Sequence, residues 1–136
     1  MPETDHTCIC CGRDNPIGLK LTFTFPTPDQ ARTEVVLPAH FCGWKSLVHG
    51  GVLAMLLDEV MAKACIQAGF TAVTAEITVR YLKPAHVNTR LTVTGTITAR
   101  KRRILHTSGE ITTPDGQRLA TATAVFVAQT MPAITP

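Results

Sequence analysis

The sequence predicts an α+β fold in which one curved antiparallel sheet wraps one long central helix. An almost unbroken apolar stretch from Val48 to Gln67 has the length of a helix rather than of a strand. Alternating and β-branched segments flank it, and short turn-rich links between the last of them favour an antiparallel meander. A helix that is apolar almost all round must be covered on most sides, and a single curved sheet does this with the fewest elements.

The elements are expected in a simple order along one domain of 136 residues. Residues 1–16 read as an irregular lead-in, and residues 130–136 as a tail that frays. Proline follows the first two predicted strands, and Gly69 ends the helix as a C-cap signal. The strands are predicted at residues 19–25, 31–37, 71–82, 90–99, 104–113 and 119–128.

Composition and charge exclude several classes of protein. The net charge of +3 is too mild to predict nucleic-acid binding, although it is compatible with a small polyanionic ligand. The polar N-terminus lacks the features of a signal peptide, and no apolar run approaches the roughly 20 residues of a spanning helix. The protein is therefore expected to be cytoplasmic and not to bind membranes.

The five cysteines are expected to be reduced thiols, because their number is odd and no signal peptide precedes them. Cys8 and Cys11 have the spacing of a metal knuckle or a redox pair. A structural zinc needs two more ligands, and no second such pair follows. The residues that could complete a site are His6, Cys10, His40 and Cys42. The prediction is that the protein binds no metal.

Asp58 is the residue of the helix that most needs an explanation. The solvent-exposed face of the helix is expected to carry three polar residues spaced four apart, at positions i, i+4 and i+8: Glu59, Lys63 and Gln67. Asp58 lies about 100° away from that face, within an apolar stripe where an unpaired charge is costly. It is therefore either a functional carboxylate or a core residue bonded to a backbone group.

The start of the helix offers a second chemical group. Gly50 and Gly51 leave backbone N–H groups uncovered at the positive end of the helix dipole, where an anion or a developing oxyanion can be held. The alternative is that these glycines serve close packing. Asp58 lies about 13 Å further along the axis, so one helix cannot place both groups on one acyl carbon. If they act together, a second copy of the helix must supply one of them.

These features resemble the hotdog fold, and more narrowly the acyl-CoA thioesterases of the phenylacetate-degradation (PaaI) type in the 4-hydroxybenzoyl-CoA thioesterase-like superfamily. Four stretches in the same order carry the resemblance. They are Cys11–Leu19, Phe41–Trp44 leading into Val48–Gly51, Leu56–Glu59 and Glu76–Pro84.

The resemblance implies hydrolysis of an acyl-CoA at a site shared across a homodimer, either alone or in a dimer of dimers. Asp58 would be the nucleophile or general base, and the Gly50 N–H would polarise the thioester carbonyl. His49 would shape the turn, and Thr74 would lie near the carboxylate. No separate cofactor is implied, because coenzyme A is part of the substrate.

The residues expected to bind the substrate lie in the loop before the helix, in its first turn and near two strand ends. Relatives usually carry Gln or Asn where Cys42 stands, and cysteine is a weak hydrogen-bonding group. Trp44 or His40 could substitute as the donor, and Gly51 is counted with Cys42 and Trp44 among the predicted substrate-binding residues. Basic side chains near two strand ends could hold the phosphates of coenzyme A or could simply be solvated surface. The predicted binding residues among them are Arg80, Lys83, Arg102 and Arg103.

Two other functions remain open at this point. The fold could be a non-catalytic acyl-CoA sensor, which the absence of Gln at position 42 favours. It could also be a hydratase or dehydratase, but such enzymes need a histidine and a carboxylate facing the same carbons. His49 and Asp58 are too far apart on one helix to do so.

Overall fold

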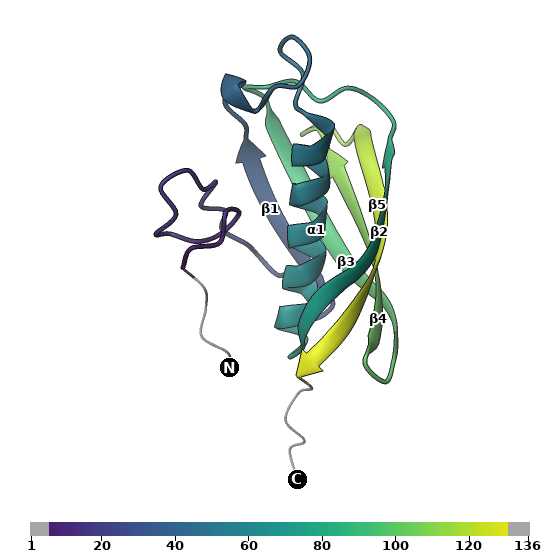
Figure 1. Ribbon diagram of the computed structural model, residues 1–136. Coiled ribbons are helices and arrows are strands. Elements are labelled where there is room, and N and C mark those ends of the chain that lie inside the picture. The colour runs from purple at the N-terminus through teal and green to yellow at the C-terminus, as the bar shows by residue number, and fades with distance from the viewer. Residues whose placement is uncertain (1–5, 131–136) are drawn as a thin grey trace.

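The computed structural model describes residues 6–130 and confirms the predicted architecture of one helix wrapped by a curved antiparallel sheet (Figure 1). Within these residues, no helix is long and apolar enough to span a membrane. The elements are β1 (Gln30–Val36), the short 3-10 helix η1 (Ala39–Phe41), α1 (Gly50–Gln67), β2 (Thr71–Tyr81), β3 (Arg90–Lys101), β4 (Ile104–Thr112) and β5 (Arg118–Thr130).

The strand order in the sheet is β1-β3-β4-β5-β2, and every pairing is antiparallel. The last three strands form the expected meander. β2 does not join it beside β3: the chain crosses over so that β2 pairs with β5 and becomes an edge of the sheet. The helix therefore has the strand that follows it, β2, at one sheet edge and the strand that precedes it, β1, at the other (Figure 1).

The predicted strand at residues 19–25 is wrong. The segment runs beside β1 but forms only an isolated bridge between Thr24 and Arg32. Lys20 has a φ of 53°, which interrupts the extended backbone. The Thr22 carbonyl accepts a hydrogen bond from the Thr33 hydroxyl at 2.7 Å instead of a backbone N–H. The apolar alternation arises because alternate side chains still face the core, without a ladder of backbone hydrogen bonds.

The helix packs into the concave face of the sheet through Leu56, Leu57, Val60 and Met61, which are fully buried. Gly95 on β3 permits the closest approach. A Cβ atom at this position would lie 2.8 Å from the carbonyl carbon and oxygen of Val60. Helix and sheet backbones are therefore nearly in contact here, and this contact fixes the depth of α1 in the sheet.

The ends of α1 follow the signals in the sequence. The helix begins at Gly50, two residues later than predicted, because Val48 donates its N–H to Ala85 and His49 is the N-cap. At the other end Gly69 has a φ of 99° and donates its N–H to Ile66. This left-handed residue after the helix confirms the predicted glycine stop.

The helix face that was predicted to be exposed is exposed at Gln67 but covered at Glu59 and Lys63. Glu59 and Lys63 form the expected i, i+4 ion pair at 3.8 Å, but their side chains are only 17% and 19% exposed. The lead-in packs over them, with the sulfur atoms of Cys8 and Cys10 within 4.8 Å of the Glu59 carboxylate. Residues 6–16 form the expected series of turns. Residues 1–5 and 131–136 lie outside the described part of the chain, and Thr130 ends β5 rather than beginning a tail.

Candidate active site

Asp58 lies on the side of α1 that faces β2. The Thr74 hydroxyl donates a 2.6 Å hydrogen bond to its carboxylate. The side chain of Asp58 is half-buried in the single chain, so it is neither in the core nor free in solvent. The structure thus brings together the helix carboxylate and the strand hydroxyl that the sequence singled out, sixteen residues apart.

An irregularity in β2 lies beside this contact. Thr74 pairs with Phe126 and Glu76 pairs with Val125, so that Ala75 is an extra residue in the ladder. Such a bulge reverses which face the following side chains occupy. Thr74 can therefore point toward α1 while Ile77 and Val79, further along, still pack against the core.

The start of α1 presents backbone N–H groups, as predicted. The Nδ1 atom of His49 accepts a 2.9 Å hydrogen bond from the Gly51 N–H, which requires Nδ1 to be unprotonated. His49 is thus the helix cap, and Gly51 is already bonded. Within residues 6–130 no hydrogen bond from the Gly50 N–H is present, so this donor remains available to a ligand.

Tyr81, which the sequence interpretation did not single out, also contacts this end of the helix. Its hydroxyl donates a 2.7 Å hydrogen bond to the Gly50 carbonyl from the end of β2. The side chain is 52% exposed, so the hydroxyl contacts the helix while about half of the residue stays at the surface of the single chain. A large aromatic residue that ends an alternating strand is the only signal that could have indicated this contact.

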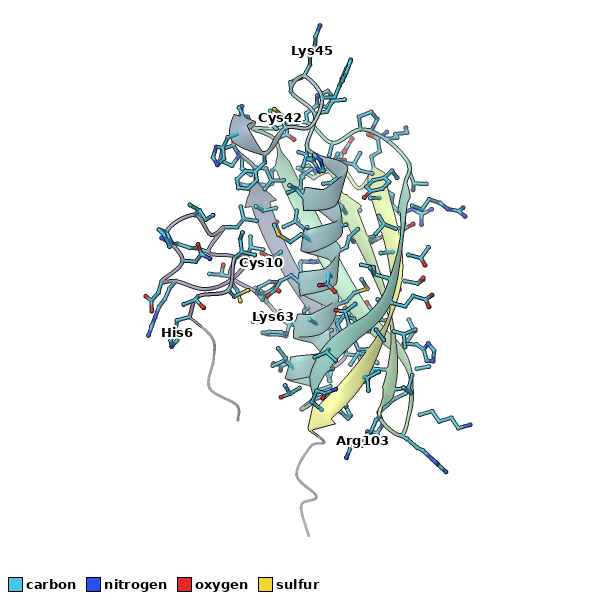
Figure 2. The ribbon with its side chains drawn as sticks, viewed as in Figure 1. His6, Cys10, Cys42, Lys45, Lys63 and Arg103 are labelled. Atoms are coloured by element: carbon cyan, nitrogen blue, oxygen red, sulfur yellow. The ribbon has the colours of Figure 1, made fainter. Side chains whose placement is uncertain are left out.

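The loop before the helix places its side chains near the start of α1 but away from Asp58. Cys42 is exposed and forms an isolated bridge with Val48. Trp44 is 74% exposed. In Figure 2 Cys42 and Lys45 lie at the end of the molecule where α1 begins. Within one chain, the loop can therefore contribute to the Gly50 end of the site, but not to the surroundings of the carboxylate.

The predicted phosphate-binding residues fall into two separate groups. Arg80 and Lys83 are exposed at the end of β2 nearest Gly50. The turn between β3 and β4, which carries Arg102 and Arg103, lies at the other end of the sheet (Figure 2). About eight residues of β2 separate the two ends, which is roughly 25 Å. One chain therefore cannot direct all four cations at a single ligand.

Arg103 is also engaged within the chain. Its Nη1 atom donates to the carbonyls of Ala128 and Gln129 at 3.3 and 3.4 Å. The residues around Arg103 instead face solvent, where an open hollow of about 500 Å³ is lined by Lys101, Arg102, Ile104 and His106. Among these predicted residues, Arg80, Lys83 and Arg102 therefore remain the stronger candidates for a phosphate.

The family model of the thioesterase superfamily matches residues 46–120, more than half of the chain. A crystal structure of a thioesterase superfamily protein is similar, with 30% identity and a TM-score of 0.85. The match covers 90% of this chain but only 60% of that protein, so the chain is considerably shorter than this relative. A comparison with curated proteins gave no match.

Two further solved structures share the fold at lower identity. A hypothetical thioesterase protein from Streptococcus pneumoniae, solved with coenzyme A, is 19% identical with a TM-score of 0.78, over 83% of this chain and 91% of that one. The E. coli PaaI protein from the phenylacetic acid degradation operon is 22% identical with a TM-score of 0.75. That match covers 80% of this chain and 83% of the PaaI chain. The streptococcal protein was also solved with an aspartate and with a threonine replaced by alanine, sixteen residues apart.

The protein has the hotdog fold, in which a curved antiparallel sheet wraps a single long helix. The helix carries a carboxylate and begins with two glycines. The chain belongs to the thioesterase superfamily. This confirms the family and the fold that the sequence predicted. The roles of individual site residues remain predictions.

Proposed function

We propose that the protein hydrolyses acyl-CoA thioesters to the free acid and coenzyme A, at sites shared between the two chains of a homodimer. The observation that carries this proposal is the Asp58–Thr74 pair on a half-exposed face of α1. The similar protein from Streptococcus pneumoniae supports the ligand, because it was solved with coenzyme A. Its two alanine variants have the same spacing as Asp58 and Thr74, which supports the choice of residues.

Two features support a dimer. β2 is an edge strand, so one side of its backbone has no neighbouring strand within the described chain. Apolar side chains are exposed on the same elements as well: Val73, next to Thr74 on β2, is 54% exposed, and Ile66, further along α1, is 45% exposed. An exposed edge and an apolar surface around a carboxylate are the features that a partner chain would cover.

The chemistry follows from these positions. Asp58 either takes a proton from water, whose oxygen then bonds to the carbonyl carbon, or attacks that carbon itself to form an anhydride that water later cleaves. In both routes the C–S bond breaks, and the coenzyme A thiolate leaves and is protonated. The partner's Gly50 N–H would stabilise the negative charge that develops on the carbonyl oxygen. The Thr74 hydroxyl would hold the Asp58 carboxylate in the attacking orientation.

The acyl-CoA sensor is a second candidate, because Cys42 offers only a weak hydrogen bond where relatives usually have Gln. A hydratase is not proposed. The Nδ1 atom of His49 already accepts from Gly51, and the ring caps the helix instead of facing Asp58.

Comparing the wild type with Asp58→Asn on a panel of acyl-CoA substrates tests the proposal. This substitution keeps the size of the side chain and removes its charge. We expect kcat to fall by about 10²–10⁴-fold, the usual contribution of a general base. The matched control is Glu34→Gln, an exposed carboxylate on β1 that pairs with Arg90 at 3.6 Å. Binding of acyl-CoA without turnover in the wild type would favour the sensor, and turnover that survives in Asp58→Asn would contradict the assignment.

A further inference from the structure

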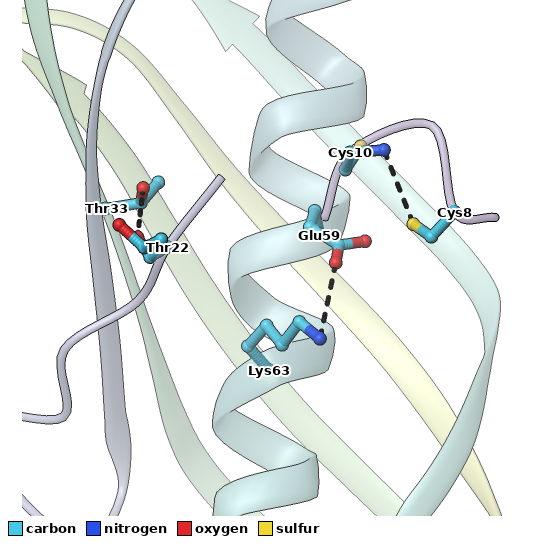
Figure 3. Close-up of polar contacts among 6 residues, drawn as sticks. All are labelled: Cys8, Cys10, Thr22, Thr33, Glu59 and Lys63. Carbon is cyan, nitrogen blue, oxygen red and sulfur yellow. Dashed lines mark hydrogen bonds and ion pairs between the residues drawn. The ribbon is translucent and has the colours of Figure 1, made fainter. Parts of the chain in front are cut away.

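A cluster of sulfur and oxygen atoms lies where the lead-in meets α1, on the helix face next to Asp58. The Sγ atoms of Cys8 and Cys10 and a carboxylate oxygen of Glu59 all lie within 4.8 Å of one another. Figure 3 shows the two cysteines on the lead-in loop directly beside Glu59 on the helix. The proposed hydrolysis uses none of these residues, so the cluster requires a separate explanation.

The backbone of the lead-in is shaped to bring these thiols together. The Cys10 N–H donates a 3.4 Å hydrogen bond to the Cys8 sulfur, and the Gly12 N–H donates to the Cys8 carbonyl at 2.8 Å. Gly12 is buried, and a Cβ atom there would lie 2.4 Å from the Cys8 nitrogen, so only glycine fits. These two contacts make a tight C-x-x-C-Gly turn and fix the Cys8 sulfur beside the helix.

Cys11 belongs to the same cluster. Hydrogen bonds of its side chain with Cys8 and Glu59 place a third thiol beside the carboxylate. Three thiols and one carboxylate thus converge where the lead-in crosses α1. A bound cation would balance the negative charge that these groups carry as metal ligands.

Among residues 6–130, Lys63 is the cation that forms an ion pair with the cluster. The Lys63 ammonium lies 3.8 Å from Glu59 and 5.5 Å from the centre of the Phe23 ring. This one positive charge pairs with the Glu59 carboxylate. Thiolate ligands at the cluster would need a further positive charge, which a divalent metal ion supplies.

We propose that Cys8, Cys10, Cys11 and Glu59 bind one zinc ion, which fastens the lead-in to α1. Three thiolates and a carboxylate supply the four donors of a closed tetrahedral structural site. Thiolate donors favour zinc over magnesium or calcium. The ion would hold the lead-in in place over the helix face next to Asp58. The C-x-x-C pair finds its remaining ligands in the adjacent Cys10 and in a helix carboxylate, which spacing along the sequence does not reveal.

The experiment uses the full chain, purified with a phosphine reductant so that no added thiol competes for metal. Bound zinc per chain is measured by atomic emission, and the protein stripped of metal is titrated with Co²⁺, whose thiolate charge-transfer absorption reports sulfur ligands. We expect one zinc per chain and a cobalt spectrum with this absorption. Cys8→Ser and Glu59→Gln should each weaken zinc binding at least about tenfold. Cys42→Ser removes an exposed thiol outside the cluster and should leave one zinc per chain.

A thermal measurement separates metal binding from a folding defect. Zinc should raise the Tm of the wild type and of Cys42→Ser, and should not raise the Tm of Cys8→Ser. Glu59→Gln serves as the second variant if Cys8→Ser does not fold. The proposal is overturned if the reduced, folded wild type binds no zinc, or if both cluster variants bind zinc as tightly as the wild type. A disulfide between Cys8 and Cys11 in protein isolated without oxygen would also overturn it.

Discussion

The Thr74 hydroxyl on β2 and the Asp58 carboxylate on α1 are joined by a 2.6 Å hydrogen bond, so the edge strand of the sheet holds a carboxylate of the helix in one orientation. Hydrogen bonds to charged groups contribute about 1.5–3 kcal/mol. If the orientation of Asp58 matters for hydrolysis, this contact must affect the rate even though Thr74 does not touch the substrate carbon.

Thr74→Val should therefore reduce kcat by about 10–100-fold, because it keeps the shape of the side chain and removes the hydroxyl. Thr74→Ser keeps the hydroxyl and should retain most of the activity. Steady-state kinetics on the preferred acyl-CoA gives the comparison. Equal losses in the valine and serine variants would mean that the residue matters for packing rather than for positioning Asp58.

Gly95→Ala should lower the free energy of unfolding by about 1–3 kcal/mol or more, because the new methyl group meets the backbone of α1 at Val60. Gly109→Ala is a matched control on the neighbouring strand, directly opposite Gly95. Its methyl group would meet the Leu57 side chain at 3.2 Å, which can shift, so the loss should be smaller. Urea denaturation of both variants gives the comparison, and equal losses would contradict the close backbone contact.

Thiol labelling tests the burial of Cys65. Burial raises the pKa of this thiol to about 11, so only about one molecule in 10³ carries its thiolate near pH 8. The exposed Cys42 should therefore be alkylated first, with Cys65 protected until the protein unfolds. Mass spectrometry after timed labelling measures both rates. Equal rates in the folded protein would show that Cys65 is accessible.

The same raised pKa has a consequence for stability. The unfolded thiol ionises near its ordinary pKa of 9.0, and the folded one near 11. The stabilising contribution of the neutral buried thiol is therefore fully present below pH 9 and is lost as the pH rises through about 11.

Gly50→Pro removes the backbone N–H that is proposed to hold the oxyanion. Proline is well tolerated at the first position of a helix, and His49 before it has the compatible φ of −58° and ψ of 133°. We expect kcat to fall by about 10²–10³-fold with the helix intact. Gly50→Ala keeps the N–H, and its methyl group would meet the Tyr81 ring at an ordinary 3.4 Å, so it should remain active. Comparable activity in both variants would remove the N–H from the mechanism.

Local patterns were sufficient to predict the helix, its glycine stop and the special position of Asp58. With 3.6 residues per turn, Asp58 points about 100° away from its neighbour Glu59. The helical period was not sufficient to decide which face of the helix is exposed to solvent. Glu59 and Lys63 are covered by the lead-in, and contacts between distant segments leave no trace in helical spacing.

One strand prediction failed for a local reason. Residues 19–25 alternate as a strand would, but the left-handed backbone at Lys20 is not signalled by a glycine. The pairing of β2 with β5 could not be predicted, since alternation indicates a strand without indicating its neighbour. The contact between Tyr81 and Gly50 depends on that placement and could not be predicted without it.

Mixed dimers of Asp58→Asn and Gly50→Pro chains test the shared site most directly. Each variant alone should be nearly inactive. If Asp58 and Gly50 come from different chains, a mixed dimer contains one site with both wild-type residues, and the mixed dimer isolated after co-expression should have about half of the wild-type kcat per dimer. Mixed dimers that form but remain as inactive as the single variants would show that each site lies within one chain, which would contradict the account.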